Sequence, residues 1–315
     1  MRAYFIALVA SLASFTSATS QTSSTSSTSE TSKTSETCLL FTGDILLDRG
    51  VRKVIGHHGI DHLFTREMDS LFRASQVVVG NLECPVTSIQ APVQKRFIFR
   101  GEPAWLGALK KHGFTHLNLA NNHSIDQGRK GLTDTRENIL KARMKPVGMG
   151  KNLQEAAQPV LLTSQPRKVW LIASLGMALE NFAYLPDRPC VNTERTQEII
   201  GRIRDIKRKD PQAVVIVSLH WGGEHTLKPV PSQRLDAHRL INAGADALIC
   251  HHTHTLQTIE HYKGRDIYYS IGNFIFDQQK TLNSQACVVK VEVTRNHVKT
   301  QALPVHIQGC VPHLK

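Results

Sequence analysis

Short apolar runs alternate with longer amphipathic segments along most of the chain, which indicates alternating strands and helices. We expect strands at 38–42, 76–79, 115–120, 169–173, 214–219 and 245–249, with helices at 60–72, 103–112, 132–142, 194–209 and 232–243. A short basic and aromatic strand is expected at 95–100, and Thr193 is expected to cap the helix at 194–209. After Asp277 two alternating strands, 286–293 and 298–305, would close an antiparallel edge. The pattern favours one α/β domain.

The amino-terminal residues depart from this rhythm. Arg2 precedes an apolar run from Ala3 to Phe15, and small residues follow before Gln21, which is typical of a signal peptide over 1–20; an uncleaved membrane anchor is the alternative. Residues 21–37 are nearly all Ser, Thr, Glu and Lys, so we expect a disordered tether. The folded domain is then 38–315, and the protein is secreted, or membrane-anchored if the first segment is retained.

Composition adds a basic character to this picture. The chain is 41% hydrophobic and 20% charged, as in an ordinary globular protein. Its formal net charge is +12, and the charges before Cys38 cancel, so the whole excess belongs to the folded domain. Without a nucleic-acid motif, this charge favours an acidic polymer or an anionic ester as partner; a basic surface without a partner is the alternative. The six cysteines permit disulfides but contain no CxxC pair.

Five of the expected strands end in side chains that bind metal ions. They are Asp44, then Asn81 with Glu83, Asn122 with His123, His220, and finally His252 with His254. Separately, each has an ordinary explanation, such as a turn cap or a histidine-rich surface loop. Together they favour a metal centre, because the carboxyl ends of strands in a layered α/β fold converge on one cleft.

The same motifs carry a family resemblance that runs from about Leu39 to Asp277. They are Thr42-Gly43-Asp44, Asn81-Leu82-Glu83, Leu119-Ala120-Asn121-Asn122-His123-Ser124-Ile125-Asp126, His220-Trp221-Gly222, His251-His252-Thr253-His254 and Gly272-Asn273-Phe274-Ile275-Phe276-Asp277. In order and spacing they resemble the CapA capsule-synthesis family, which has a calcineurin-like metallophosphoesterase fold. This resemblance implies a four-layer α/β/β/α sandwich, in which two mixed sheets face each other and helices cover the outside.

The resemblance also implies roles for single residues. Asn122, His220 and His252 would hold one divalent transition metal, and Asp44 and His254 a second, with a bridging oxygen from Asn81 or Glu83. His123 would be the catalytic acid, and Asp126 is also placed in the catalytic set. The chain departs from the metallophosphoesterase pattern at Leu46, where a histidine is usual, at Asn81, where an aspartate is usual, and at Cys250, where a glycine is common. One ion or two are expected, and the ligand types suit Mn, Fe or Zn alike.

Further residues are expected around the centre. Arg49 and Arg100, with Lys95 and Arg96 as weaker candidates, would hold an acidic substrate, unless they are only solvated surface cations. His251, Asn273 and Asp277 would support the ligands, with a plain turn as the alternative for the last two.

The resemblance implies an exported CapA-like protein of poly-γ-glutamate biosynthesis or export, which works beside membrane synthase subunits. A metal-dependent hydrolase is favoured. A secreted hydrolase unrelated to capsule and a non-catalytic scaffold that binds polyanions are the alternatives.

Overall fold

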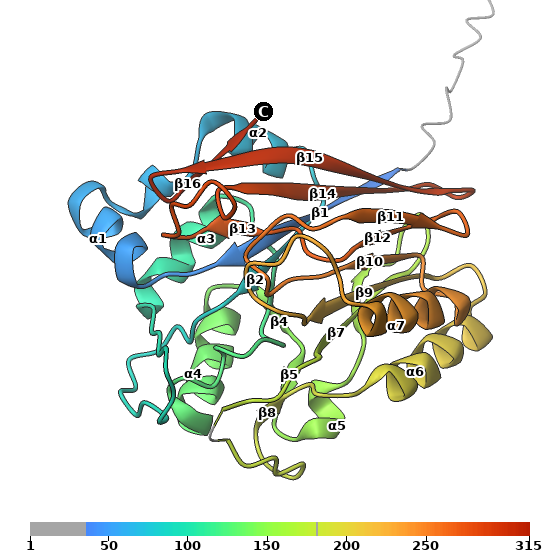
Figure 1. Cartoon of the computed structure of the whole chain (residues 1–315), viewed down its shortest axis with the longest axis horizontal. Helices are drawn as coiled ribbons and strands as arrows, with labels where there is room; N and C mark the ends of the chain where they lie inside the picture. Colours follow the sequence, from blue (N-terminus) through green and yellow to red (C-terminus); the bar gives the residue numbers. More distant parts are fainter. Residues whose placement is uncertain (1–35, 181) are drawn as a thin grey trace, which may run out of the picture. The chain divides into compact units, whose positions relative to one another are not determined.

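The computed structural model describes residues 36–180 and 182–315 (Figure 1). The expected signal peptide or anchor at 1–20, and all but the end of the expected tether at 21–37, lie outside these residues. Thr37 already belongs to the first strand. Among the described residues, no helix combines the length and the apolar character that crossing a membrane requires.

Two mixed sheets form the centre of the described part of the chain. The first has the order β16 (Val311–Leu314), β15 (Val298–Gln308), β14 (Gln285–Val293), β1 (Thr37–Ile45), β2 (Val77–Leu82), β3 (His116–Asn118) and β4 (Lys145–Val147), and β13 (Asn273–Ile275) also pairs with β1. The second has the order β11 (Ile259–Tyr262), β12 (Arg265–Tyr268), β10 (Ala247–Ile249), β9 (Val214–His220), β7 (Val169–Leu175) and β6 (Val160–Thr163). A small sheet pairs β5 (Met149–Gly150) with β8 (Cys190–Val191).

Helices connect the strands of both sheets. The α-helices are α1 (Arg49–His58), α2 (Arg66–Arg73), α3 (Leu106–Lys111), α4 (Gly128–Lys141), α5 (Leu153–Ala156), α6 (Thr196–Lys209) and α7 (Pro231–Asn242), and the 3-10 helices are η1 (Ile60–Leu63) and η2 (Pro103–Trp105). Figure 1 shows α6 and α7 side by side against the second sheet.

The layers follow from the alternation of side chains along each strand. Leu39 and Phe41 of β1 pack in an apolar cluster with residues of the second sheet, whereas Leu40 between them packs against the helices outside the first sheet. In β9, Ile216 points into the shared cluster and Val217 into a third one with α6 and α7. Because successive residues of a strand face opposite sides, each sheet buries both faces. The expected α/β/β/α sandwich is confirmed.

A bulge in β1 sets the direction of the first candidate ligand. The pairing of β1 with β2 shifts register between Phe41 and Asp44. A Cβ atom on Gly43 would lie 2.1 Å from the carbonyl oxygen of Gly272, so only glycine fits where β1 passes β13. Beyond the bulge, Asp44 pairs with Asn81 of β2 and Asn273 of β13. The bulge thus turns the end of β1 toward two further polar strand ends.

The structure corrects three details of the expected elements. Residues 95–100 form a loop rather than a strand, because the backbone N–H groups of Phe99 and Arg100 donate to the carboxylates of Asp126 and Asp48 instead of a neighbouring strand. The helix expected at 60–72 is divided into η1 and α2, since Thr65 caps the second part. Helix α6 begins after Arg195, not Thr193, because the Glu198 carboxylate accepts from the Arg195 N–H.

The six cysteines all lie among the described residues, and there their thiols are free. Five are buried. Burial raises the pKa of Cys250 and of Cys287 to about 12, so these thiols are protonated side chains of the core.

Candidate metal centre

The polar strand ends of both sheets meet in one buried cluster. The first sheet brings Asp44 from the end of β1, Asn81 and Glu83 from the end of β2, and Asn122 and His123 from the turn after β3. The second sheet brings His220 from the end of β9, and His251, His252 and His254 from the loop after β10. An isolated parallel bridge between His220 and His251 joins the two segments of the second sheet. The first sheet therefore supplies mainly oxygen atoms and the second supplies imidazoles.

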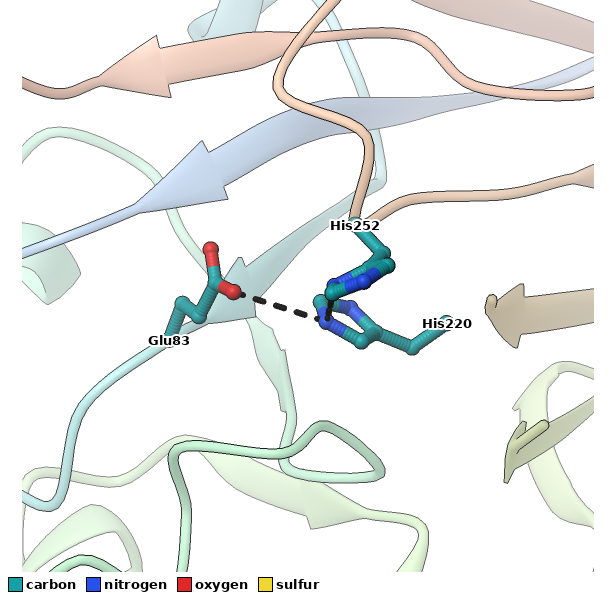
Figure 2. A group of neighbouring side chains, drawn as sticks. All are labelled: Glu83, His220 and His252. Atoms are coloured by element: carbon teal, nitrogen blue, oxygen red, sulfur yellow. Dashed lines mark hydrogen bonds and ion pairs between the residues drawn. The ribbon is translucent and has the colours of Figure 1, made fainter. Parts of the chain in front are cut away.

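One group of potential ligands surrounds Nε2 of His220 (Figure 2). This nitrogen lies 3.1 Å from Nδ1 of His252 and 3.4 Å from Oε1 of Glu83. Oδ1 of Asn122 approaches the same nitrogen at 2.7 Å. In a tetrahedral site with bonds of about 2.1 Å, ligand atoms stand roughly 3.4 Å apart, so these spacings suit an ion among them.

A second group shares Glu83 with the first. Nδ1 of His254 lies 3.4 Å from Oδ2 of Asp44 and 3.9 Å from Oε2 of Glu83. The two oxygen atoms of Glu83 thus face different histidines, His220 and His254. Between the two bridging ligands that the sequence leaves open, this geometry favours Glu83. Asn81 instead donates to Oδ1 of Asp44 at 2.8 Å.

The centre contains buried polar atoms that no protein group satisfies. Oδ2 of Asp44, both carboxylate oxygens of Glu83 and Nδ1 of His251 have no hydrogen-bond partner among the described residues. An unsatisfied buried oxygen is costly, and a buried carboxylate more so. These residues therefore fit a divalent transition metal, which would satisfy the carboxylates and the imidazoles together.

The electrostatics of the two carboxylates differ. Burial would raise the pKa of Asp44, but the imidazoles of His251 and His254, each 3.4 Å from one of its oxygens, outweigh burial and hold this pKa well below its ordinary value. Burial and the neighbouring charge of Asp44 raise the pKa of Glu83 well above its ordinary value. Without an ion, therefore, neighbouring imidazoles offset the burial of Asp44, whereas the charge of His254 does not offset that of Glu83.

The histidines respond to the same surroundings. Burial and the neighbouring His252 lower the pKa of His220 well below its ordinary value. Burial and the charge of His254 lower the pKa of His252 to about 4, so both rings are neutral and suited to bind a metal. Burial would lower the pKa of His254, but Glu83 and Asp44 raise it to about 9. His254 would release a proton on binding an ion.

The loop after β10 holds two of its histidines in an unusual conformation. The φ angle is 99° at His252 and 56° at His254. Residues other than glycine rarely adopt a positive φ, and the strain persists only where the surroundings fix it. Asn273 contributes to this, because its Oδ1 lies 2.9 Å from Nδ1 of His254. Asn273 thus helps to hold the ring of His254 in place, and its expected support of a metal ligand stays a prediction.

The position at which the resemblance expects a histidine is part of the core. Leu46 is fully buried and packs with the cluster outside the first sheet. From the second sheet, Nδ1 of His251 approaches Oδ1 of Asp44 to 3.4 Å. An imidazole thus reaches Asp44 from another strand, although it is not part of either ligand group.

His123 and Asp126 form a dyad beside the centre. Nδ1 of His123 lies 2.8 Å from Oδ2 of Asp126, and Nζ of Lys95 lies 2.8 Å from its Oδ1. Burial lowers the pKa of His123, although Asp126 acts in the opposite direction. The neutral ring therefore donates from Nδ1 to the carboxylate and leaves a lone pair on Nε2. Lys95 is buried against Asp126, so this lysine is not available to a substrate.

The expected substrate-binding arginines have partners of their own. Arg49 forms an ion pair with Asp277 and lies 5.0 Å above the ring of Phe99, which in turn packs 4.3 Å from the ring of His123. Asp277 accepts from Arg49 and from the Gly50 N–H, and its expected support of the ligands stays a prediction. Arg100 pairs with Glu102, and its guanidinium also donates to the carbonyl of Thr87.

Two residues that lie near the centre, His225 and Asn283, were not among those predicted from the sequence. His225 donates its backbone N–H to the carbonyl of Thr253, and its ring centroid lies 6.2 Å from that of His254. Asn283 donates to the carbonyl of His254 at 2.9 Å. His225 follows the strand end at His220 closely enough to be found from the sequence. Asn283 follows a loop without a motif, and no local pattern signals its role.

Comparison with solved structures identifies this architecture. A hypothetical protein from Thermus thermophilus is similar in structure, with a TM-score of 0.51 at 12% identity over 85% of this chain and 99% of that one. Haemophilus influenzae NAD nucleotidase (NadN) gives a TM-score of 0.50 at 9% identity over 86% of this chain and 50% of that one. The fold is metallophosphoesterase-like, as the sequence predicted.

Sequence relatives define the family within that fold. The family model "Bacterial capsule synthesis protein PGA_cap" matches residues 38–278. The PGA biosynthesis protein CapA of Bacillus subtilis is 34% identical over 86% of this chain and 72% of its own length. The capsule biosynthesis protein CapA of Bacillus anthracis is 30% identical over 87% of this chain and 68% of its own length. The chain belongs to the PGA_cap family of bacterial capsule synthesis proteins.

Proposed function

We propose that this chain is an exported protein of poly-γ-glutamate biosynthesis or export, and that it acts as a metal-dependent hydrolase on an anionic ester or amide. The single observation that carries the hydrolase is the pair of ligand groups that share Glu83, with buried oxygens that lack partners among the described residues. The names of the Bacillus relatives support the capsule polymer as the setting. The net charge of +12 suits an acidic polymer. Export rests on the pattern over 1–20.

The proposed ligands form two groups, one for each ion. Glu83, His220 and His252, with Asn122, would hold one ion, and Asp44, Glu83 and His254 the other. Divalent ions there would lower the pKa of a bound water toward about 7 and neutralise charge on the attacked group.

His123 and Asp126 would together supply a proton to the leaving group. Asp126 fixes the ring of His123 through Nδ1. Nε2 of His123 would accept the proton that the attacking water loses and pass it to the leaving oxygen or nitrogen as the bond between that atom and the attacked group breaks. Lys95 and the Phe99 N–H compensate the Asp126 charge while this carboxylate orients the ring of His123.

Elemental analysis of the purified protein tests the metal centre directly. We expect about one or two equivalents of Mn, Fe or Zn in the wild type and loss of at least one equivalent in His252→Ala. His261→Ala is the matched control, because this histidine is exposed and lies outside the centre. Wild-type protein without transition metal under every loading condition would contradict the proposal.

Hydrolysis assays then separate the candidate functions. Cleavage of a γ-glutamyl substrate supports a role in polymer processing, whereas cleavage of a generic phosphodiester alone indicates a hydrolase unrelated to capsule. The metal-free protein could instead bind poly-γ-glutamate and show no hydrolysis with any added metal. This result would contradict the hydrolase and indicate a non-catalytic scaffold. Expression of the full chain in a bacterial host, with fractionation of cytoplasm, membrane and medium, tests export.

A further inference from the structure

His225 lies at the rim of the metal centre on a tightly held loop. Its side chain is 43% exposed, whereas His252 and His254 are buried. The next residue, Thr226, accepts from Oγ1 of Thr255 at 2.5 Å and from Nε2 of Gln257 at 3.1 Å. The loop between β9 and α7 is therefore fixed against the loop that carries the ligands.

The hydrogen bonds of Asn283 fix which nitrogen of the neutral His225 ring carries the hydrogen. Nδ2 of Asn283 lies 2.9 Å from the carbonyl oxygen of His254, and a carbonyl only accepts, so the amide nitrogen must occupy this side. The same nitrogen lies 3.0 Å from Nδ1 of His225. An amide nitrogen cannot accept a hydrogen bond, so Nδ1 of His225 must be the acceptor. The neutral ring therefore carries its hydrogen on Nε2.

The hydrogen on Nε2 of His225 has no strong partner among the described residues. Oε2 of Glu224 lies 3.9 Å from this nitrogen, which is too long for a hydrogen bond. The backbone of His225 has a φ of 58°, a conformation that costs energy for histidine. His225 therefore keeps an energetically costly backbone conformation, and its Nε2–H, beside the metal centre, is not engaged by a strong acceptor among the described residues.

This arrangement is the opposite of that at His123. There Nδ1 donates to Asp126 and Nε2 keeps a lone pair, so His123 exchanges protons. At His225, Nδ1 accepts from Asn283 and Nε2 donates. The two imidazoles serve different tasks because different partners fix their tautomers.

We propose that His225 is a substrate-binding residue, whose Nε2–H donates to an anionic oxygen of the substrate, in a phosphate ester or a carboxylate. Its location at the active centre rests on the proposed function, whereas its tautomer does not. Asn283 is a positioning residue, which orders the ring and ties it to the ligand loop.

Nuclear magnetic resonance of ¹⁵N-histidine-labelled full-length protein tests the tautomer without metal or turnover. We expect His225 in the Nε2–H form, assigned by the signal that disappears in His225→Asn. In Asn283→Asp an oxygen replaces the donor, so the ring should change to the Nδ1–H form. An Nδ1–H ring in the wild type would overturn the proposal.

Calorimetry of the metal-loaded protein tests the binding role, with inorganic phosphate and γ-glutamylglutamate as probes. In His225→Asn the new Oδ1 can still accept from Asn283, and asparagine tolerates a positive φ, but no donor remains at the position of Nε2. We expect about tenfold weaker binding of the probe that represents the substrate, with unchanged metal content and melting temperature. His225→Gln, which returns a distal donor, should recover part of the affinity.

The outcomes separate this proposal from the proposed function. Weakening for phosphate alone indicates an ester substrate, and weakening for the dipeptide alone indicates a carboxylate. Equal affinities of wild type and His225→Asn for both probes, or binding of neither probe by the wild type, would overturn the role of His225. Absence of hydrolysis together with intact metal and weakened probe binding would overturn only the catalytic function.

Discussion

Two kinds of buried carboxylate occur in this protein. Asp246 accepts from Nζ of Lys207 at 2.7 Å and from the Val215 N–H at 2.9 Å, and Arg265 lies 3.1 Å from its other oxygen. Asp126 is satisfied in the same way by a lysine, a histidine and a backbone N–H. By contrast, one oxygen of Asp44 and both oxygens of Glu83 have no hydrogen-bond partner among the described residues.

The difference separates structural from functional burial. A carboxylate that the protein satisfies completely is part of the folded framework. One that the protein buries without partners costs stability and is retained where a ligand compensates it. In this chain the open carboxylates coincide with the meeting point of two sets of strand ends, and this coincidence supports the proposed metal centre at that position.

The largest expected effect is the loss of metal on changing Glu83, the residue that both ligand groups share. Glu83→Gln should lower metal content to below about a tenth of the wild type and reduce hydrolysis by about 100-fold or more, because an amide is a weak ligand and cannot bridge two ions as a carboxylate does. Elemental analysis and a hydrolysis assay measure both. Glu137→Gln, on the exposed face of α4, should change neither; equal metal content in Glu83→Gln would remove Glu83 from the ligand set.

The satisfied carboxylate should behave in the opposite way. Asp246→Asn leaves Lys207 without its buried partner and should lower the free energy of unfolding by about 3 kcal/mol, with metal content unchanged. Urea denaturation measures this change. The exposed pair of Asp205 and Arg208 provides the control, since Asp205→Asn should cost at most about 0.5 kcal/mol. A loss of metal in Asp246→Asn would break the distinction between the two kinds of carboxylate.

A buried histidine outside the centre predicts how stability depends on pH. Burial and the charge of Lys145 lower the pKa of His116 to about 4, so the unfolded chain binds more protons than the folded protein between pH 4 and pH 6.5. Stability attributable to this residue is present above about pH 6.5 and falls by about 2 kcal/mol between about pH 7 and pH 5. His116→Asn should remove that part of the slope, measured by denaturation at both pH values. The same slope in wild type and variant would contradict the prediction; exposed His57→Asn is the control.

The smallest expected effect concerns Glu83 without metal. Burial and Asp44 raise the pKa of Glu83, so its charged form is disfavoured in the metal-free protein. Glu83→Gln should therefore stabilise the metal-free protein by about 1 kcal/mol at about pH 7 while abolishing the stabilisation that added metal gives to the wild type. Thermal denaturation with and without chelator measures both. A destabilised metal-free variant would show that Glu83 is satisfied after all.

Much of the fold could be predicted from local pattern. The apolar runs at 214–219 and 286–293 are long and strongly periodic, and they appear as β9 and β14 with closely similar bounds. The strand expected at 95–100 was wrong because hydrogen bonds to distant side chains determine the backbone there. Asp48 and Asp126 draw residues 95–100 into a loop that sequence periodicity assigns to a strand. Residue-by-residue propensity cannot include a partner that lies far along the chain.

Strand periodicity and short motifs are local properties, so the fold class, the family and the set of polar strand ends could all be recognised before any contact was known. Which of these side chains act together depends on the packing of the two sheets and on the bulge at Gly43. That packing brings both oxygens of Glu83 between His220 and His254, pairs Arg49 with Asp277, and places Asn283 between His225 and the ligand loop. These contacts join residues that are distant in sequence. Hydrogen-bond partners, and with them tautomers and pKa shifts, exist only after that packing is complete.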